Sequence, residues 1–411
     1  MRVKHGLSES GVYAGVIFLL WPFLSLFFSF MNYKEPWAKN IVWFFVAFFG
    51  YTMVISNTEI DANRLVEGFY YFHNNVNSFA DLLTILINEP DFFMPFFNYY
   101  VSRVIDDIRV YLFLLALIFG YFYSRNIFFI LDKKKGSFKT LALFLFILFI
   151  FVVPFWNING FRFWSATNLF VFGAYRYFFS KNKKYLIWSL LSVLVHFSFI
   201  LPIAILAIYI ILGKRVKLYY TFYFVSFFFL QISPEAVNSS VGLFYLPKNV
   251  ETEISVYSSE EYVESKKKLG KGAMSWYVTI GPVTAKYVVF ILLSIVFFKY
   301  RNYVKNENLM SLFCFSLLLL GAGILFSSVP SGARFIAVAY LFVFAFLFLI
   351  IQNQNIRISS LIKSFSIFSI VLYVALVLRV GLETIGVSTL ISNPLFAYIG
   401  NIDVAIIELI K

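Results

Sequence analysis

Two arginines and one histidine stand where this chain is otherwise apolar. Arg162 opens an apolar stretch after the turn-forming pair Asn159-Gly160, and Arg334 opens another after a Pro-Ser-Gly-Ala run. His196 lies inside a further apolar stretch, two residues before Ser198. Ionisable groups held at membrane depth are rare and mark functional sites, because a bilayer penalises charge. We therefore take these three residues as the first candidates for chemistry.

The two arginines suit a diphosphate. Each guanidinium offers paired donors that match phosphate oxygens. The free N–H groups of a helix N-terminus add to anion binding, and Gly160 and Gly332 would let the backbone approach a ligand closely. A boundary arginine can instead reach lipid headgroups, which is how we interpret Arg379. Two arginines that follow glycine-containing turns favour the ligand-binding interpretation.

Proton transfer needs a base, and the chain offers three candidates. Histidine has an ordinary pKa of about 6.5, which suits proton transfer at neutral pH, so His196 comes first. Asp61 and Glu89 come next, as carboxylates of the long polar stretch 57–108. We interpret His73 as a solvated loop residue.

Other chemistries lack their sequence signatures. The chain has no Walker loop, no dinucleotide-binding glycine fingerprint and no HExxH motif. With three histidines and one cysteine, a His/Cys metal centre is not expected, and a carboxylate-bound divalent ion is the remaining metal option. A nucleotide-driven pump or a zinc protease is therefore not expected, and we expect the site to work without a metal or cofactor.

Apolar helices must position these residues. The chain has 411 residues, of which 61% are hydrophobic and 13% charged, whereas a soluble protein is about 25% charged. Apolar runs of about 17 residues or more are typical of transmembrane helices. We place such segments at 11–31, 41–55, 111–131, 140–155, 163–180, 185–212, 219–232, 283–298, 309–326, 335–351 and 364–378. No small-residue cleavage site precedes the first segment, so we expect it to be retained.

The basic residues orient the loops. The net charge of +13 fits lysines collected in cytoplasmic loops better than a nucleic-acid-binding surface. The basic clusters lie at 132–135, 181–184, 214–217, 299–305 and 357–363. The stretch 57–108 has eight acidic residues against two basic ones and can face outward.

The apolar segment 185–212 conflicts with this orientation, because a basic cluster flanks each of its ends. Two half-helices that turn near residues 196–202 would keep both clusters on one side. About fourteen helical residues reach only about 21 Å, too little to span the hydrocarbon core. We therefore favour a re-entrant hairpin over one spanning helix. The predicted fold is an all-α, polytopic membrane helix bundle with about ten transmembrane helices plus this hairpin, or about eleven spanning helices without it.

The chain is predicted to form a single transmembrane domain over 1–411. Its two long outer loops, 57–108 and 233–281, are expected to be partly helical and to cover the site. The second loop carries tyrosines and Trp276 beside charged residues, a composition that suits sugar rings. A solvated loop packed on the bundle is the alternative.

An ordered set of short patches resembles the EpsG-type group of Wzy polysaccharide polymerases. The patches extend from Asp61 to Arg334, about two thirds of the chain. They are Asp61 before Glu67-Gly68-Phe69-Tyr70-Tyr71, then Glu89-Pro90-Asp91-Phe92, Asn159-Gly160-Phe161-Arg162 with Ala166, His196-Phe197-Ser198, and finally Arg334. The arginine that usually precedes the first acidic patch is absent, and Arg64 is the candidate to replace it.

The resemblance implies a GT-C-like fold and a polymerase at the outer face of the bacterial cytoplasmic membrane. The growing glycan on undecaprenyl diphosphate would be the donor, a single lipid-linked repeat unit the acceptor, and a chain-length regulator protein a further partner. The implied site consists of a base at His196, Glu89 or Asp61, diphosphate-binding Arg162, Arg334 and Arg64, and supporting Asn159, Gly160, Ser198 and Tyr70.

Three other functions share some of these features. An O-antigen ligase would transfer the same kind of glycan to a lipid A core. A flippase or secondary transporter would show internal repeats with broken helices in both halves, whereas we find one broken segment and no repeat. A membrane acyltransferase also uses an intramembrane histidine. The ordered patches favour the polymerase over all three.

Overall fold

The computed structural model describes residues 9–55, 61–229, 276–301, 304, 306–329, 331–400 and 404–410, with side chains from 280 onward in the third range. In chain order the helices are α1 (Glu9–Leu20), α2 (Pro22–Met31), α3 (Ala38–Thr52), α4 (Asp61–Asn75), α5 (Phe79–Asn88), α6 (Phe93–Val101), α7 (Ile108–Leu131), α8 (Thr140–Val152), η1 (Phe155–Gly160), α9 (Phe161–Ser180), η2 (Lys183–Tyr185), α10 (Leu186–Val195), η3 (Phe197–Phe199), α11 (Ile200–Leu212), α12 (Val216–Phe228), α16 (Trp276–Ile295), η4 (Val296–Tyr300), α17 (Glu307–Leu325), α18 (Arg334–Asn353), α19 (Ser360–Gly381), α20 (Val387–Ile391), α21 (Pro394–Ile399) and α22 (Ile406–Ile410).

The predicted all-α class is confirmed over these residues, where β pairing is limited to two isolated bridges. Six stretches are long and apolar enough to cross a bilayer, as expected for a multi-pass membrane protein. They are Ile108–Leu131, Thr140–Ser180, Ile280–Tyr300, Glu307–Leu325, Arg334–Asn353 and Ser360–Gly381. The larger number of about ten crossings stays a prediction, because several apolar helices are shorter.

The predicted segment 11–31 illustrates this shortening. The structure divides it at Trp21 into α1 and α2. Pro22 begins α2, where its missing N–H and fixed ring favour a helix start and disfavour a straight continuation from α1. The Trp21 and Ser25 N–H groups still bond to carbonyls one turn earlier, at 2.7 and 3.2 Å, so the two helices form one bent run.

Small residues let the first long helices pack closely. A Cβ added to Gly50 of α3 would lie 2.3 Å from the Cβ of Ala116 in α7. The same addition at Gly120 of α7 would lie 2.9 Å from the Cβ of Val46. Such close backbone approach is typical of helix pairs in membranes.

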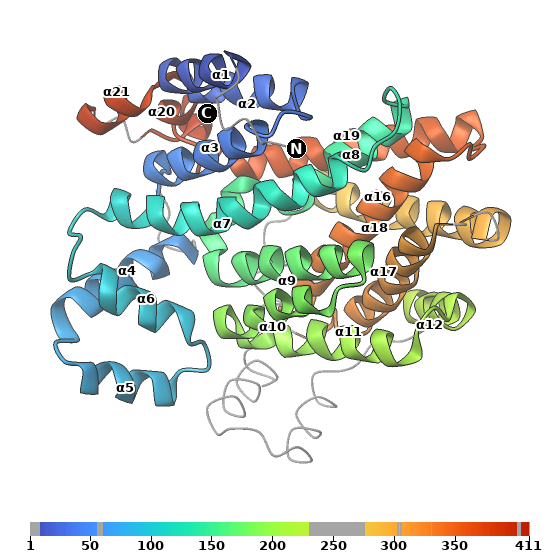
Figure 1. The fold of residues 1–411 in the computed structure, drawn as a ribbon, viewed down its shortest axis with the longest axis horizontal. Helices are drawn as coiled ribbons and strands as arrows, with labels where there is room; N and C mark the ends of the chain where they lie inside the picture. Colours follow the sequence, from blue (N-terminus) through green and yellow to red (C-terminus); the bar gives the residue numbers. More distant parts are fainter. Residues whose placement is uncertain are drawn as a thin grey trace, which may run out of the picture.

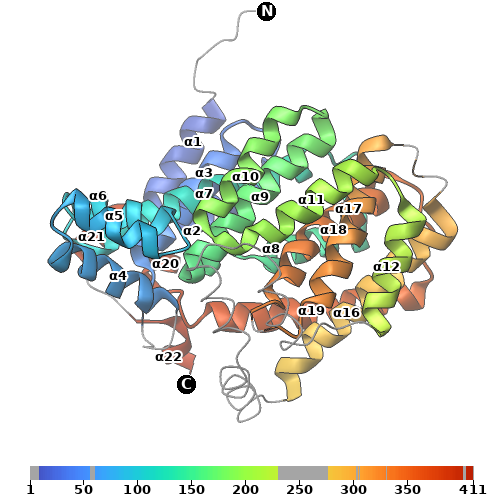
Figure 2. The same cartoon turned by 90° about the horizontal axis from the view of Figure 1, so that it is seen from below.

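Helix α18 lies at the centre of the bundle. Its residues from Val338 to Gln352 are buried except for Tyr340. Figures 1 and 2 show α17 and α18 between α9 on one side and α12 with α16 on the other. Helices from both halves of the chain therefore surround α18.

Helices α4, α5 and α6 form a separate group at one end of the bundle (Figure 1). They share a small apolar core built from Phe72, Val76, Leu82 and Tyr99. The Tyr111 hydroxyl of α7 donates to the Asn98 side-chain oxygen of α6 at 2.7 Å and so ties the group to the bundle. Residues 61–101 of the predicted outer loop are thus mostly helical. Residues 233–275 of the second predicted loop lie outside the described residues.

The apolar segment 185–212 is broken in the middle, as predicted. Helix α10 ends at Val195, His196 is extended with φ −152° and ψ 116°, and α11 starts at Ile200. The flanking basic loops meet again at the start of α17. Lys181 Nζ donates to Ser311 Oγ at 2.8 Å, and Lys214 Nζ lies 3.1 Å from Glu307 Oε2. The two half-helices therefore return to the end of the bundle from which they start.

Other lysines gather at this same end. The Lys139 ammonium, in the loop before α8, donates to the carbonyls of Ile351 and Gln354 at 3.0 and 2.7 Å, where α18 ends. A cation there also complements the helix dipole. Arg334 stands at the opposite end of α18. The bundle thus has a lysine-rich end and a second end at which Arg334 begins its helix.

Labelling with an impermeant thiol reagent tests this arrangement. In a Cys314→Ser background, single cysteines at Lys183 and Arg215 should react from the same side of the membrane. A cysteine at Ser331, in the turn before α18, should react from the other side. Opposite labelling of positions 183 and 215 would mean that 185–212 crosses the membrane once.

Candidate functional site

A short turn places Arg162 at the start of α9. The Asn159 side-chain oxygen accepts the Gly160 N–H at 2.7 Å, which closes the turn at the end of η1. Helix α9 begins at the next residue, and Arg162 follows in its first turn. The Arg162 side chain keeps 46% of its surface exposed, so its guanidinium can meet a ligand.

Asp91 is the buried partner of Arg162. Its carboxylate, with 3% of the side chain exposed, lies between α5 and α6, and its Oδ2 stands 3.1 Å from Arg162 Nη1. Its Oδ1 accepts the Phe197 N–H at 2.8 Å, so one carboxylate joins the start of α9 to the break after α10. Burial raises the pKa of the Asp91 carboxyl, and Arg162 and the Phe197 N–H oppose that rise.

Packing of α6 explains why Asp91 reaches this position. Phe93 at the start of α6 packs against Phe161 at the start of α9, with ring centroids 5.8 Å apart. Pro90 directly precedes the aspartate and restricts the backbone there. The two helix starts are thereby held side by side, with the carboxylate between them.

His196 lies next to this pair. Its Nδ1 is 3.8 Å from Asp91 Oδ1, too long for a hydrogen bond. Instead Nδ1 accepts the Ser198 N–H at 3.4 Å and lies 3.2 Å from the Ser198 hydroxyl. A neutral imidazole that accepts at Nδ1 carries its hydrogen on Nε2. The Phe163 ring is nearly perpendicular to the imidazole and packs against it, with ring centroids 5.5 Å apart.

Asp61 connects the remaining arginines. Its carboxylate lies 3.6 Å from Arg64 Nη1 and 3.6 Å from Arg334 Nη2. A Cβ added to Gly160 would lie 3.5 Å from Asp61 Oδ2, an ordinary contact distance, so the carboxylate lies beside the Arg162 turn. The Arg334 guanidinium also stands 5.6 Å from the Phe163 ring centroid.

These contacts unite two ion-paired groups around Phe163 and Gly160. The first group is Asp91 with Arg162 and His196, and the second is Asp61 with Arg64 and Arg334. We call the six residues the charge cluster. Three guanidinium groups against two carboxylates leave a surplus positive charge, and Arg162, Arg334 and Asp61 are each more than 40% exposed. Such an arrangement can bind an anion and exchange a proton beside it.

Other predicted site residues lie elsewhere. Glu89 is exposed at the end of α5, and Tyr70 on α4 is 44% exposed, with no contact to the charge cluster in the described part of the chain. Gly332 serves the turn itself, because an added Cβ would lie 2.0 Å from the Phe326 carbonyl oxygen. Its role in admitting a ligand stays a prediction. Ser331 beside it has a positive φ of 64°, which fits a tight turn.

Asp91 is the residue that sequence reasoning missed. It stands two positions after Glu89, and in a loop sequence the two carboxylates look alike. The available signal was its place directly before the aromatic pair Phe92-Phe93, because an acid next to an apolar helix start can be carried into the interior. In the described residues, no group of three or more His, Cys, Asp or Glu side chains gathers in a way that could hold a metal ion.

The fold is that of a multi-pass helical membrane protein, and the charge cluster gathers three arginines, two carboxylates and a histidine at one end of its bundle. The model of the EpsG family matches residues 40–393. The chain therefore belongs to the EpsG family, the family of Wzy-type polysaccharide polymerases. No curated protein and no solved structure matches the chain.

Substitutions of Asp91 should distinguish the contribution of its contact with the Phe197 N–H from that of its contact with Arg162. In Asp91→Ala the Phe197 N–H loses its partner, so we expect a loss of about 1–3 kcal/mol of stability. Asp91→Asn keeps an oxygen for that N–H and should lose less. Thermal unfolding of the purified protein measures both, with the exposed neighbour Glu89→Ala as control. If Asp91→Ala unfolds at the same temperature as the native protein, the Asp91 carboxylate does not stabilise the break between α10 and α11.

Proposed function

We propose that this protein polymerises oligosaccharide repeat units linked to undecaprenyl diphosphate. It would transfer the growing glycan from its lipid carrier to an acceptor repeat unit and release undecaprenyl diphosphate. Family membership supports the class of reaction. The observation that carries the proposal is the convergence of Arg162 and Arg334, each from a helix start, beside two carboxylates and His196.

In this proposal Arg162 and Arg334 bind the diphosphate of the donor. Arg64, paired with Asp61, adds charge at the edge. The three guanidinium groups stabilise the negative charge that grows on the leaving oxygen as the bond to the sugar breaks. Such stabilisation is commonly the largest catalytic contribution, and no nucleotide is needed because the diphosphate already activates the donor.

Binding of the diphosphate would also prepare the base. When Arg162 turns toward phosphate oxygens, Asp91 loses its cationic partner, and its Oδ1 stands 3.8 Å from His196 Nδ1. A small approach would let the carboxylate accept a hydrogen on Nδ1, which leaves Nε2 free to take a proton. A carboxylate that selects the tautomer of a catalytic histidine is the arrangement of serine-protease triads. Asp91 is thus a positioning residue in the proposed mechanism.

The transfer step forms one bond at the anomeric carbon of the donor and breaks another. The acceptor hydroxyl gives its proton to His196 Nε2 while its oxygen bonds to the anomeric carbon of the donor. The bond from that carbon to the diphosphate oxygen breaks, and the electron pair stays on the diphosphate. The resulting imidazolium lies beside the Asp91 carboxylate, which stabilises it. Asp61, 42% exposed, is the alternative base in this site.

We assign the charge cluster to the outer face of the bacterial cytoplasmic membrane. Lysine-rich loops face the cytoplasm in multi-pass proteins, and here they gather at the end of α18 opposite Arg334. The segment 185–212 would then be a re-entrant hairpin that brings His196 to the site from within the bilayer. Non-helical backbone at that depth is tolerated when protein covers it, and Phe163 and Asp91 lie beside it. A chain-length regulator protein would be a partner outside the bundle.

A glycan ladder from cells that depend on this chain tests the proposal. Arg162→Ala, Arg334→Ala and His196→Ala should each abolish the ladder and leave a single capped repeat unit. Loss of one group that stabilises the transition state costs about 10²–10³ in rate, enough to remove long products. Arg379→Ala is a matched control, because Arg379 pairs with Glu383 one turn away at another helix end.

Two other outcomes would replace the proposal. Long lipid-linked chains that never reach a lipid A core would identify a ligase. Absence of any repeat unit on the outer side would identify a transporter. Membrane insertion of each variant, measured in the same cells, separates loss of activity from loss of protein.

A further inference from the structure

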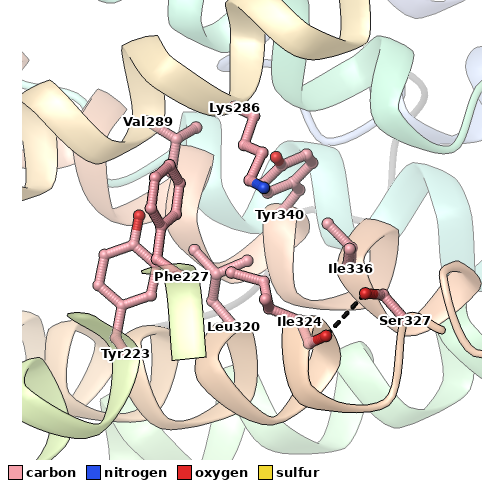
Figure 3. Close-up of a pocket in the computed structure, with 9 residues that line it drawn as sticks. All are labelled: Tyr223, Phe227, Lys286, Val289, Leu320, Ile324, Ser327, Ile336 and Tyr340. Carbon is pink, nitrogen blue, oxygen red and sulfur yellow. Dashed lines mark hydrogen bonds between the residues drawn. The ribbon is translucent and has the colours of Figure 1, made fainter. Parts of the chain in front are cut away.

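A second polar site lies on the other side of the α17–α18 turn. A cavity of about 60 Å³ opens between α12, α16, α17 and α18, and Lys286 reaches into it from α16 (Figure 3). Tyr223, Tyr340 and Ser327 also line it, while Phe227 and Ile336 supply apolar walls. A lysine directed into a bundle from an apolar span marks a functional site rather than a lipid-facing surface.

Two polar groups of the cavity, Tyr223 and Lys286, lack a hydrogen-bond or ion-pair partner in the described part of the chain, whereas the Ser327 hydroxyl donates to the Ile324 carbonyl at 2.7 Å (Figure 3). The Tyr223 side chain is 0% exposed, and its hydroxyl makes no hydrogen bond there. The Lys286 ammonium lies 4.6 Å from the Phe227 ring centroid but forms no ion pair with a described carboxylate. A buried hydroxyl without a partner costs free energy, so a polar ligand or water is expected beside it.

The size and depth of the cavity indicate the ligand. At about 10–15 Å³ for each water, it has room for a few waters or for the oxygens of one phosphate group, and not for a sugar ring. Tyr340 lies six residues below Arg334 on α18, or about 9 Å along the helix. The cavity is therefore near the end of the bundle that carries the charge cluster. An ammonium with hydroxyl donors suits a phosphate oxygen.

We propose that Lys286 and Tyr223 bind the phosphate-bearing headgroup of a second lipid-linked substrate. This inference rests on the proposed polymerisation, which requires two lipid diphosphates at once, one as donor and one as acceptor. The charge cluster would hold one headgroup and the Lys286 cavity the other. The α17–α18 turn separates them, because Arg334 faces Phe163 of α9 whereas Ser327 and Ile336 face the cavity.

Counting bound lipids tests this assignment without turnover. The full chain would be purified and mixed with undecaprenyl diphosphate, and native mass spectrometry would count the molecules bound. The native protein should bind two lipids. The Lys286→Met variant and the double variant Arg162→Ala/Arg334→Ala should each bind one lipid. Tyr223→Phe should weaken the second site about tenfold while it keeps the ring. Lys299→Met, an exposed lysine near the other end of the same helical run, is the matched control and should bind two.

Each outcome separates the two proposals. Two lipids bound to Lys286→Met would overturn the Lys286 site and leave the charge cluster standing. Equal filling of the site by phosphatidylglycerol would make it a general phospholipid site and would also overturn the assignment to a substrate. One lipid that depends on Lys286 and not on the arginines would instead remove the proposed diphosphate site of the charge cluster.

With a synthetic lipid-linked repeat unit, the same variants give a kinetic readout. Lys286→Met should raise the substrate concentration needed for half-maximal polymerisation about tenfold and change the maximal rate little, because it removes binding away from the reacting atoms. Lys286→Arg should restore much of the affinity, since it keeps the charge. If Lys286→Met instead lowered the maximal rate about tenfold and left the half-maximal substrate concentration unchanged, a binding role for Lys286 would be excluded.

Discussion

The site depends on one buried carboxylate. Asp91 contacts Arg162 at the start of α9 and the backbone N–H of Phe197 after α10, and it lies beside His196. These groups belong to three different parts of the chain. A buried carboxylate is costly without partners, so the parts are held together by the need to satisfy it. In the proposed mechanism its position also orients Arg162 and His196 toward the substrate.

The break in the segment 185–212 also serves to satisfy the Asp91 carboxylate. A continuous helix would use the Phe197 N–H within its own ladder and would leave Asp91 without this donor. The extended His196 instead turns that N–H toward the carboxylate, and Ser198 bonds back to the imidazole. The backbone N–H groups of Phe197 and Ser198, freed from the helix at the break, thus find side-chain partners. Phe163 packs on both His196 and Phe199 and gives the irregular backbone an apolar cover.

Local rules made part of this site predictable. A glycine-containing turn followed by an apolar run predicts a helix start, and Arg162 and Arg334 both stand at such starts. Loop charges alone predicted the break near His196. Asp91 could not be ranked above Glu89, because its burial depends on the packing of α6 against α9, which no local pattern encodes. Lys286 was hidden in a predicted span, since the direction of a side chain depends on the neighbouring helices. For the same reason the number of crossings could not be read from apolar runs, some of which are bent or short.

The pairing within the charge cluster has a consequence for the end of a reaction cycle. Arg162 has Asp91 as an internal counter-ion, and Arg64 and Arg334 share Asp61. A bound anion must displace these carboxylates, which lowers its net affinity. The carboxylates can return as the anion departs, so bare guanidinium groups never have to face the bilayer surface. In the proposed reaction, competition between these carboxylates and the released diphosphate would therefore set how long the diphosphate stays bound, and the same arginines without carboxylate partners would hold it longer.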